Sequence, residues 1–393
     1  MLGKAKALNP WHTARGEWMA RVRIDPMVIA FILLVGIFSV LTNGDFLSSR
    51  NVALLLRQAT ITAIAASGMV LVIVARQIDL SVGSVAALVA GIAAILQVDY
   101  GYDTWIVVVT CLIVAGLVGM IHGFLAAYVG VPAFIVTLGG MLVWRGVILL
   151  VTGGRSISGM HDSFRILGQG FLNPTWSWVF TVGLLVASML FSWFIGYWRR
   201  TVTSSAGSAE RRKGLYRIAA GWVLAIGAVH VMNRYEGLPV PAIILAVVVL
   251  TLGLVAEYTP FGRQLYAIGD NPEAARLAGI DVRKRVLGAF TIMGVVSGIT
   301  GLVLAARLSG FGSNVGNLLE LDAIAAAVIG GTSLTGGEGS VPRAVAGAVV
   351  MACIDNGMSL MNVDPFWQYV VKGCMLVTAV AVDLAGKNRR PVD

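Results

Sequence analysis

The stretch TPFGRQLYAIGDNPEAARLAGIDVRKRV, Thr259–Val286, is polar, charged and rich in turn residues, and strongly apolar sequence lies on both sides of it. Asn271 followed by Pro272 predicts a helix start, because Asn accepts from first-turn amides and Pro lacks a donor where none is needed. Gly279 predicts the helix end. We therefore expect a short helix over Pro272–Ala278, set between two apolar regions where a soluble partner can push.

The same residues resemble a known motif. Glu273-Ala274-Ala275-Arg276-Leu277-Ala278-Gly279 resembles the E-A-A-x-x-x-G loop of ABC importer permeases, the segment that docks on the ATPase subunit. Local physics alone leaves an ordinary solvated loop as the alternative. The resemblance implies a role in ATPase coupling for Asn271, Pro272, Glu273, Ala274, Ala275, Arg276 and Gly279.

The composition places most of the chain in a membrane. Of 393 residues, 57% are hydrophobic and only 12% charged, whereas soluble domains carry about a quarter charged residues. The apolar runs are long and continuous, which favours helices over a closed barrel. The sequence therefore predicts an all-α polytopic membrane protein with about 12 transmembrane segments, within a range of 10–12. The three Cys lie in apolar runs without metal-ligand spacing, so a disulfide framework is not expected.

Twelve apolar runs serve as candidate spans. They are approximately 27–42, 52–75, 82–97, 105–128, 132–152, 175–197, 218–232, 239–258, 287–306, 321–334, 344–361 and 366–384. The third, seventh and tenth are short for a span of roughly 20 residues and can be tilted, broken or half-helices. The basic N-terminus precedes an apolar run without a cleavage site, which predicts an uncleaved first span.

The distribution of basic residues predicts the orientation. With 12 spans, 21 Lys and Arg fall on one side and five on the other, which places both termini in the cytoplasm. The net charge of +9 is explained in this way, without a nucleic-acid partner. The expected organisation is a cytoplasmic tail (1–26), a permease domain (27–384) containing a basic cytoplasmic loop (198–217) and a coupling loop (259–286), and a cytoplasmic C-tail (385–393).

A short pattern occurs twice. Gly83–Gly91 and Gly339–Gly347 share G-S-V-x-x-x-V-A-G, and upstream Ala63–Ala66 matches Ala323–Ala326. Both copies run in the same direction in the expected topology, which suggests two halves related by an axis along the membrane normal. Chance identity among common small residues is the alternative.

Each copy follows or adjoins a polar break, Arg76–Ser81 in the first and Thr332–Glu338 in the second. Irregular backbone at membrane depth persists only against protein or a water-filled cavity, although tight cytoplasmic turns are the simpler interpretation. Ionisable residues in the spans, which are Asp322, His122, Arg145, Asp355 and Lys372, should face the protein interior. Amides beside aromatic residues near Asn356 and Gln368 suit sugar passage, or form an interfacial aromatic belt. The candidate translocation path comprises Asp79, Ser81, Gly83, Ser84, Asp322, Thr332, Ser333, Asn356 and Gln368.

Several enzymatic motifs are absent from the sequence. It contains no phosphate-binding G-x-x-x-x-G-K-[ST] loop, no H-E-x-x-H, no C-x-x-C and no G-x-S-x-G. We therefore expect a transport subunit without its own ATPase site, so that ATP-driven transport needs another chain. An intramembrane enzyme lacks a visible nucleophile–base pair.

Four further stretches carry a wider resemblance. Ile78–Ser84, Val131–Gly139, Tyr266–Gly279 and Ala327–Leu334 together resemble the ribose/xylose-type monosaccharide ABC permeases, over most of the chain. Additional sequence resembles the D-xylose carriers of that family specifically, namely about Trp176–Met232, Ile354–Ser359 and Phe366–Gly373.

The resemblance implies a complete transport system. It implies a homodimer in a bacterial inner membrane, in contact with lipid, a sugar ATPase subunit with tandem nucleotide-binding domains, and a periplasmic sugar-binding protein. The substrate implied is D-xylose or a related monosaccharide, with ribose, arabinose or galactose as alternatives. This chain would bind no cofactor, while its partner uses ATP and Mg. An ion-coupled symporter is a different class, for which Asp79 or Asp322 would be the titratable residue.

Overall fold

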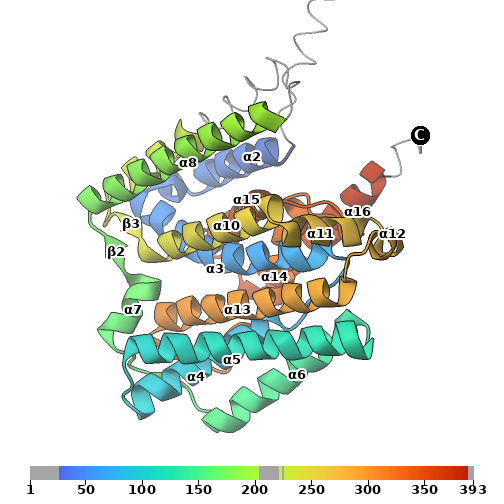
Figure 1. The fold of residues 1–393 in the computed structure, drawn as a ribbon. Coiled ribbons are helices and arrows are strands. Elements are labelled where there is room, and N and C mark those ends of the chain that lie inside the picture. Colours follow the sequence, from blue (N-terminus) through green and yellow to red (C-terminus); the bar gives the residue numbers. More distant parts are fainter. Residues whose placement is uncertain (1–25, 203–220, 224, 388–393) are drawn as a thin grey trace, which may run out of the picture.

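The computed structural model describes residues 26–202, 221–223 and 225–387. These residues form a helical bundle whose long helices run between two ends of the molecule (Figure 1). The helices are α2 (Pro26–Leu41), α3 (Ser49–Val74), α4 (Val82–Ala94), α5 (Thr104–Phe124), α6 (Ala133–Thr152), α7 (Asp162–Gln169), α8 (Pro174–Val202), α10 (Val240–Tyr258), α11 (Pro260–Asp270), α12 (Pro272–Leu277), α13 (Val282–Leu308), α14 (Leu319–Ile329), α15 (Val341–Leu360) and α16 (Pro365–Lys387).

The two ends of the bundle differ in content. Helices α11 and α12 lie at one end together with the C-terminal end of α16, and we call this the α12 end (Figure 1). The opposite end, the α7 end, carries α7 and two short antiparallel ladders. Strands β1 (Ile157–Ser158) and β4 (Gly310–Phe311) form one ladder, and β2 (Phe171–Leu172) and β3 (Leu238–Pro239) form the other.

The core is built around α3. From Ala59 to its end this helix is almost continuously buried, and α10, α13, α14 and α15 pack around it. A surface helix of a soluble protein has a polar face, whereas a helix buried on all sides is apolar all round, as α3 is. Small residues set the closest crossing, because a Cβ on Gly119 of α5 would meet the backbone of Phe290 and Gly294 in α13.

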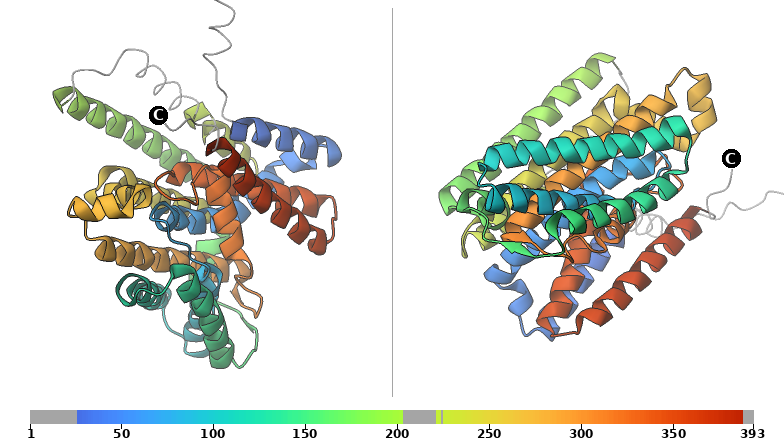
Figure 2. Two further views of the ribbon diagram at one scale, coloured as in Figure 1. Left: turned by 90° about the vertical axis from the view of Figure 1, so that its right-hand side faces the viewer. Right: turned by 90° about the horizontal axis from the view of Figure 1, so that it is seen from below.

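Six helices of the described chain are long and apolar enough to cross a membrane. They are α3, α4 with the π-helical turn Ile95–Asp99, α5 with the π-helical turn Leu125–Val129, α6, α10 and α13. Shorter apolar helices cover Met27–Leu41, Pro174–Leu190 and Gly221–Met232. Helix α16 lies at the periphery against α14 and α15 (Figure 2). All 12 predicted runs therefore contain helix.

The structure differs from the sequence-based expectation in five places. Helix α14 has 11 residues and ends at Ile329, where the expected run continued to residue 334. At about 1.5 Å per residue it is roughly half as long as the bilayer core is thick. Helices α7 and α11 were not expected, and a 3-10 turn (Asp45–Leu47) precedes α3. Helix α8 extends to Val202, into the stretch expected as a basic loop, and residues 203–217 of that loop lie outside the described residues.

Candidate functional site

Helices α11 and α12 are built from successive capping signals. The Thr259 hydroxyl accepts from Gly262 N at 3.2 Å and starts α11. The Asn271 side chain accepts from Glu273 N and Ala274 N, both at 3.0 Å, and starts α12. In both helices Pro occupies the first position, where its missing N–H costs nothing. The predicted start of α12 is confirmed, while α11 was missed although Thr259-Pro260 carries the same signal.

The end of α12 also follows the predicted chemistry. Gly279 has φ of +82°, the left-handed conformation that favours glycine, and α12 ends at Leu277, one residue before the expected end. Asp281 then accepts from Lys284 N at 3.1 Å and starts α13. This backbone hydrogen bond is the main reason that the pKa of Asp281 lies below its ordinary value.

Helix α12 presents a mixed surface. Glu273, Ala274 and Arg276 are exposed, and the Leu277 side chain is 86% exposed. Ala275 is buried at 5% exposure, so it packs against the protein instead of joining the exposed face. Sequence reasoning placed Ala275 on the partner-facing side and did not single out Leu277. A fully exposed leucine on a short, rigidly capped helix is a suitable anchor for another chain.

The first polar break adjoins these helices. Arg76 Nε donates to Gly269 O at 2.6 Å and Arg76 Nη2 donates to Asp270 O at 2.8 Å, so this side chain contacts the last turn of α11. The hydroxyl of Tyr266 donates to Gly339 O at 3.0 Å. Burial, helped by Glu257, raises the pKa of Tyr266, so the hydroxyl keeps its proton for this bond.

The second polar break is a compact, partly buried turn. Ser333 N donates to Glu338 O at 2.9 Å, and the hydroxyls of Ser333 and Thr335 lie 2.9 Å apart. Thr332 and Ser333 are buried, and Thr332 Oγ1 has no hydrogen-bond partner in the described part of the chain. Gly339 leaves room for Thr332, because a Cβ there would lie 2.9 Å from its methyl group. Both predicted breaks are therefore irregular in the structure.

Asp79 and Ser81 of the first break form a hydrogen-bonded chain with His122 and Trp144. Asp79 Oδ1 accepts from Ser81 N at 2.8 Å and from Ser81 Oγ at 2.6 Å. Ser81 Oγ lies 3.2 Å from His122 Nδ1, and Trp144 Nε1 donates to His122 Nε2 at 2.9 Å. Indole is only a donor, so His122 must be neutral with its proton on Nδ1. The chain then runs in one direction, from Trp144 through His122 and Ser81 to the Asp79 carboxylate.

An irregular segment between α13 and α14 lies against the start of α4. A Cβ on Gly83 would meet the Glu320 carboxylate and Gly316 O. Arg145 Nη1 donates to Val315 O at 2.7 Å, which fixes this segment to α6. Glu320 is buried, and sequence reasoning missed it because its neighbours are remote in the chain. Ser84, also predicted, is buried next to Gly83 and donates to Ser81 O at 2.7 Å.

Asp322 belongs to a separate ionic cluster. Lys372 Nζ lies 3.0 Å from Asp322 Oδ2 and 2.9 Å from Asp355 Oδ2, which joins α14, α15 and α16. A cavity of about 90 Å³ adjoins Asp322 and Lys372 and is otherwise lined by apolar residues, Gly373 and Tyr369. One ammonium thus serves two carboxylates, and Asp355 Oδ1 has no partner among the described residues.

The last two predicted path residues lie elsewhere. Asn356 and Asn51 exchange two amide hydrogen bonds, at 2.8 and 2.9 Å, and thereby join α15 to α3. Gln368 is half-buried on α16 and donates to Val363 O at 3.4 Å. The structure therefore keeps Asp79, Ser81, Gly83 and Ser84 together and places Thr332 and Ser333 near the α12 end. Asp322, Asn356 and Gln368 lie in three further places.

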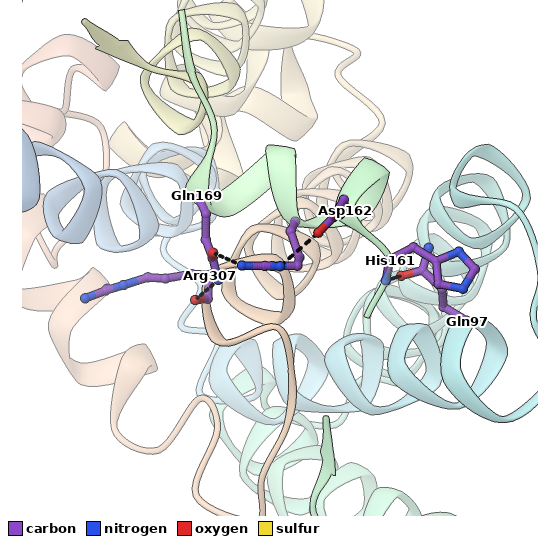
Figure 3. A network of polar contacts seen from close by, with 6 residues as sticks. Gln97, His161, Asp162, Gln169 and Arg307 are labelled. Carbon is purple, nitrogen blue, oxygen red and sulfur yellow. Dashed lines mark hydrogen bonds and ion pairs between the residues drawn. The ribbon is translucent and has the colours of Figure 1, made fainter. Parts of the chain in front are cut away.

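A polar network holds α7 against the bundle (Figure 3). Gln97 Oε1 accepts from His161 N at 3.3 Å, just before α7 starts. At the end of α7, Gln169 Nε2 donates to Arg307 O at 2.9 Å, so the helix is attached at both ends. In the described residues, no group of three His, Cys, Asp or Glu side chains is arranged to hold a metal ion.

The fold and the site indicate the general class of protein. A bundle of long apolar helices with buried polar groups and irregular backbone between helices is a polytopic membrane protein. The chain matches the family model described as branched-chain amino acid transport system / permease component, over residues 51–380, and it belongs to this family of permease components. It is a multi-pass protein of the bacterial inner membrane.

Curated relatives cover nearly the whole chain. The xylose transport system permease protein XylH of Escherichia coli (strain K12) is 42% identical over 94% of this chain and 93% of its own length. The protein of the same name from Haemophilus influenzae is 40% identical over 92% and 96%. The ribose import permease protein RbsC of Haemophilus influenzae is 33% identical over 90% and 91%. No solved structure matches the chain.

Proposed function

We propose that this chain is the permease subunit of an ATP-binding cassette importer that moves D-xylose, or a closely related monosaccharide, across the inner membrane. The observation that carries the proposal is the identity of 42% and 40% to two xylose permeases over nearly the full length of both partners. The lower identity of 33% to a ribose permease makes ribose the first alternative substrate, ahead of arabinose and galactose. The match to the wider family of permease components supports the permease class but does not indicate the substrate.

The proposal assigns α12 to ATPase docking. Its exposed residues Glu273, Ala274, Arg276 and Leu277 would meet a separate ATPase with tandem nucleotide-binding domains, which binds ATP and Mg itself. Asn271 and Pro272 fix the start of the helix and Gly279 fixes its end. The helix would therefore move as a rigid unit when the ATPase displaces it. This chain would bind no cofactor. In this proposal the α12 end lies in the cytoplasm, with 12 spans and both termini on the same side.

The sugar path remains part of the proposal. Asp79, Ser81, Gly83 and Ser84 are buried, and Gly83 lies against Glu320 in the first turn of α14. Two copies of the chain, as a homodimer surrounded by lipid, would enclose the path and receive sugar from a periplasmic binding protein at the α7 end. The remaining predicted residues, Asp322, Thr332, Ser333, Asn356 and Gln368, would contribute from the other copy or support the helices. No nucleic acid is involved.

Reconstitution tests the function directly. Proteoliposomes carrying this permease and its ATPase, with binding protein added, should accumulate labelled xylose only when MgATP is present. Ribose, arabinose and galactose in parallel assays determine the substrate order. An ionophore that collapses ion gradients should leave uptake unchanged. Uptake that needs an ion gradient but not ATP would establish the ion-coupled alternative, and would overturn the ABC assignment.

Docking through α12 has its own test. Leu277→Asp replaces the exposed apolar side chain with a charge, and Gly279→Val forces a β-branched residue into a left-handed position. Both should reduce co-purification of the ATPase at least tenfold, while Leu277→Met, the matched control, retains it. Ala275→Glu is less informative, because Ala275 is buried and its replacement perturbs folding. Undiminished binding of the ATPase to Leu277→Asp would exclude this surface.

A further inference from the structure

Arg76 adopts an unusual backbone conformation at the end of α3. Its φ is +59°, which is uncommon for a residue with a side chain. This conformation turns the guanidinium toward the last turn of α11, where Nε donates to Gly269 O at 2.6 Å and Nη2 to Asp270 O at 2.8 Å. The last carbonyls of a helix lack intrahelical donors, and a cation there also suits the helix dipole. Arg76 therefore satisfies the end of a helix 193 residues away in sequence.

The second polar break completes the same contact. Gly337 N donates to Val74 O at 3.0 Å, so the break is joined to the end of α3. A Cβ on Gly269 would collide with Val74 O and Gly337 N, and a Cβ on Gly336 would collide with the Arg76 side chain. The end of α3, the end of α11 and the second break are thus packed backbone to backbone, and Arg76 lies between them.

This junction lies within a few residues of α12, α4 and α15. Only Asn271 separates α11 from α12. On the other side Arg76 leads within three residues to Asp79, whose carboxylate holds Ser81 N at the start of α4. Tyr266 of α11 donates to Gly339 O, immediately before α15. A displacement of α12 therefore reaches the starts of both helices that carry the repeated G-S-V sequence.

We propose that Arg76 is a positioning residue for energy coupling, which transmits movement of α11 and α12 to the starts of α4 and α15. The inference rests on the proposed function, because it assumes that an ATPase moves α12. It assigns to Arg76 no contact with sugar or ATP. Its fork of donors bridges two carbonyls at once, which a single ammonium group cannot do with the same geometry.

The decisive quantity is the number of sugar molecules moved per ATP hydrolysed. In the reconstituted complex, Arg76→Ala should still retain the ATPase, because α12 keeps its caps, but sugar moved per ATP should fall at least tenfold. Arg76→Lys should restore part of this ratio, since it keeps the charge but loses the fork. Arg263→Ala is the matched control and should behave as wild type. Arg263 is exposed on α11, the helix that Arg76 contacts.

The outcomes separate this inference from the function itself. Failure of the wild-type complex to transport any monosaccharide would overturn the proposed function. Normal transport per ATP by Arg76→Ala, or loss of the ATPase from that variant, would overturn only the coupling role of Arg76. If Arg76→Ala does not reach the membrane, Tyr266→Phe decides, because it removes one hydroxyl from the same junction. A two- to fivefold loss of sugar per ATP supports the proposal, and an unchanged ratio overturns it.

Discussion

The two copies of G-S-V-x-x-x-V-A-G have the same sequence pattern and different surroundings. In the first copy α4 already begins at Val82, and the missing side chain of Gly83 makes room for the Glu320 carboxylate and Gly316 O. In the second copy α15 begins only at Val341, and the equivalent glycine, Gly339, makes room for the side chains of Val74 and Thr332. The last glycine of the second copy, Gly347, lies against the backbone of α14. Small residues allow close approach, but they do not determine what approaches.

The surroundings of the two copies also differ in charge. The first copy borders a polar chain and the buried Glu320, and the preceding break leads directly into α4. The second copy packs against α14 and carries a charge of its own, Arg343, with Glu338 directly before it. Asp355, which meets Lys372, lies further along α15. Both copies run from the α12 end toward the α7 end, as expected from the topology. They are therefore similar in direction but unequal in structure.

Bulky substitutions should disable both copies for different reasons. Gly83→Trp must displace Glu320 and the irregular segment, so uptake should fall more than tenfold while much of the protein still reaches the membrane. Gly347→Trp must separate α15 from α14, so it should lower the amount of folded protein as well. Gly139→Trp is the control, because nothing lies within 4 Å of a Cβ at that exposed position.

Uptake and membrane content measured together test this distinction. Full uptake by Gly83→Trp and Gly347→Trp would show that neither copy lies near the path. Equal loss of membrane content in both variants would show that the first copy, like the second, serves only helix packing.

Removing the shared cation beside the second copy should have the next largest effect. Lys372→Met leaves Asp322 and Asp355 without their partner, and breaking a buried ion pair in this way costs about 3–5 kcal/mol. We expect a much lower unfolding temperature in detergent. Combining it with Asp322→Asn and Asp355→Asn should recover most of the loss, because no charge is then left unpaired.

Lys284→Met is the matched control for this comparison. Lys284 pairs with Asp281 at 3.2 Å on the surface, where solvent screens such pairs and they contribute little to stability. If Lys372→Met is no more destabilising than Lys284→Met, the Lys372 cluster contributes little to the stability of the helices around the second copy. The proposed difference in charge between the two copies would then have no effect on stability.

Trp144 offers a smaller test beside the first copy. Trp144→Phe removes the donor to His122 Nε2 and should cost about 1 kcal/mol, the usual net value of one hydrogen bond. Nitrogen chemical shifts of labelled His122 should report the Nδ1–H tautomer in the wild type. Trp105→Phe, at an exposed site, should change neither quantity. A proton on Nε2 in the wild type would contradict the direction of the polar chain.

The features predictable from sequence are those set by neighbouring residues. Asn271, Pro272 and Gly279 determine α12 because caps and stops act within a few residues. The two breaks were predictable for the same reason. The partners of Arg76 and the position of Glu320 were not, because they depend on segments that meet only after the helices pack. Asp322, Asp355 and Lys372 were each noticed as costly in a membrane, but their pairing needed the fold.

The equivalent serines of the two copies give the finest comparison. Ser84 is buried in α4 and its hydroxyl donates to Ser81 O at 2.7 Å, whereas Ser340 precedes α15 and its side chain makes no capping hydrogen bond. Ser84→Ala should therefore cost about 0.5–1.5 kcal/mol, the range for one lost hydrogen bond. Ser340→Ala should stay within about 0.5 kcal/mol of the wild type, as for sites without a specific contact. The measurement is the unfolding temperature of each variant in the same detergent. Equal shifts would mean that the starts of α4 and α15 are held alike, and that the inequality between the copies lies only in their glycines.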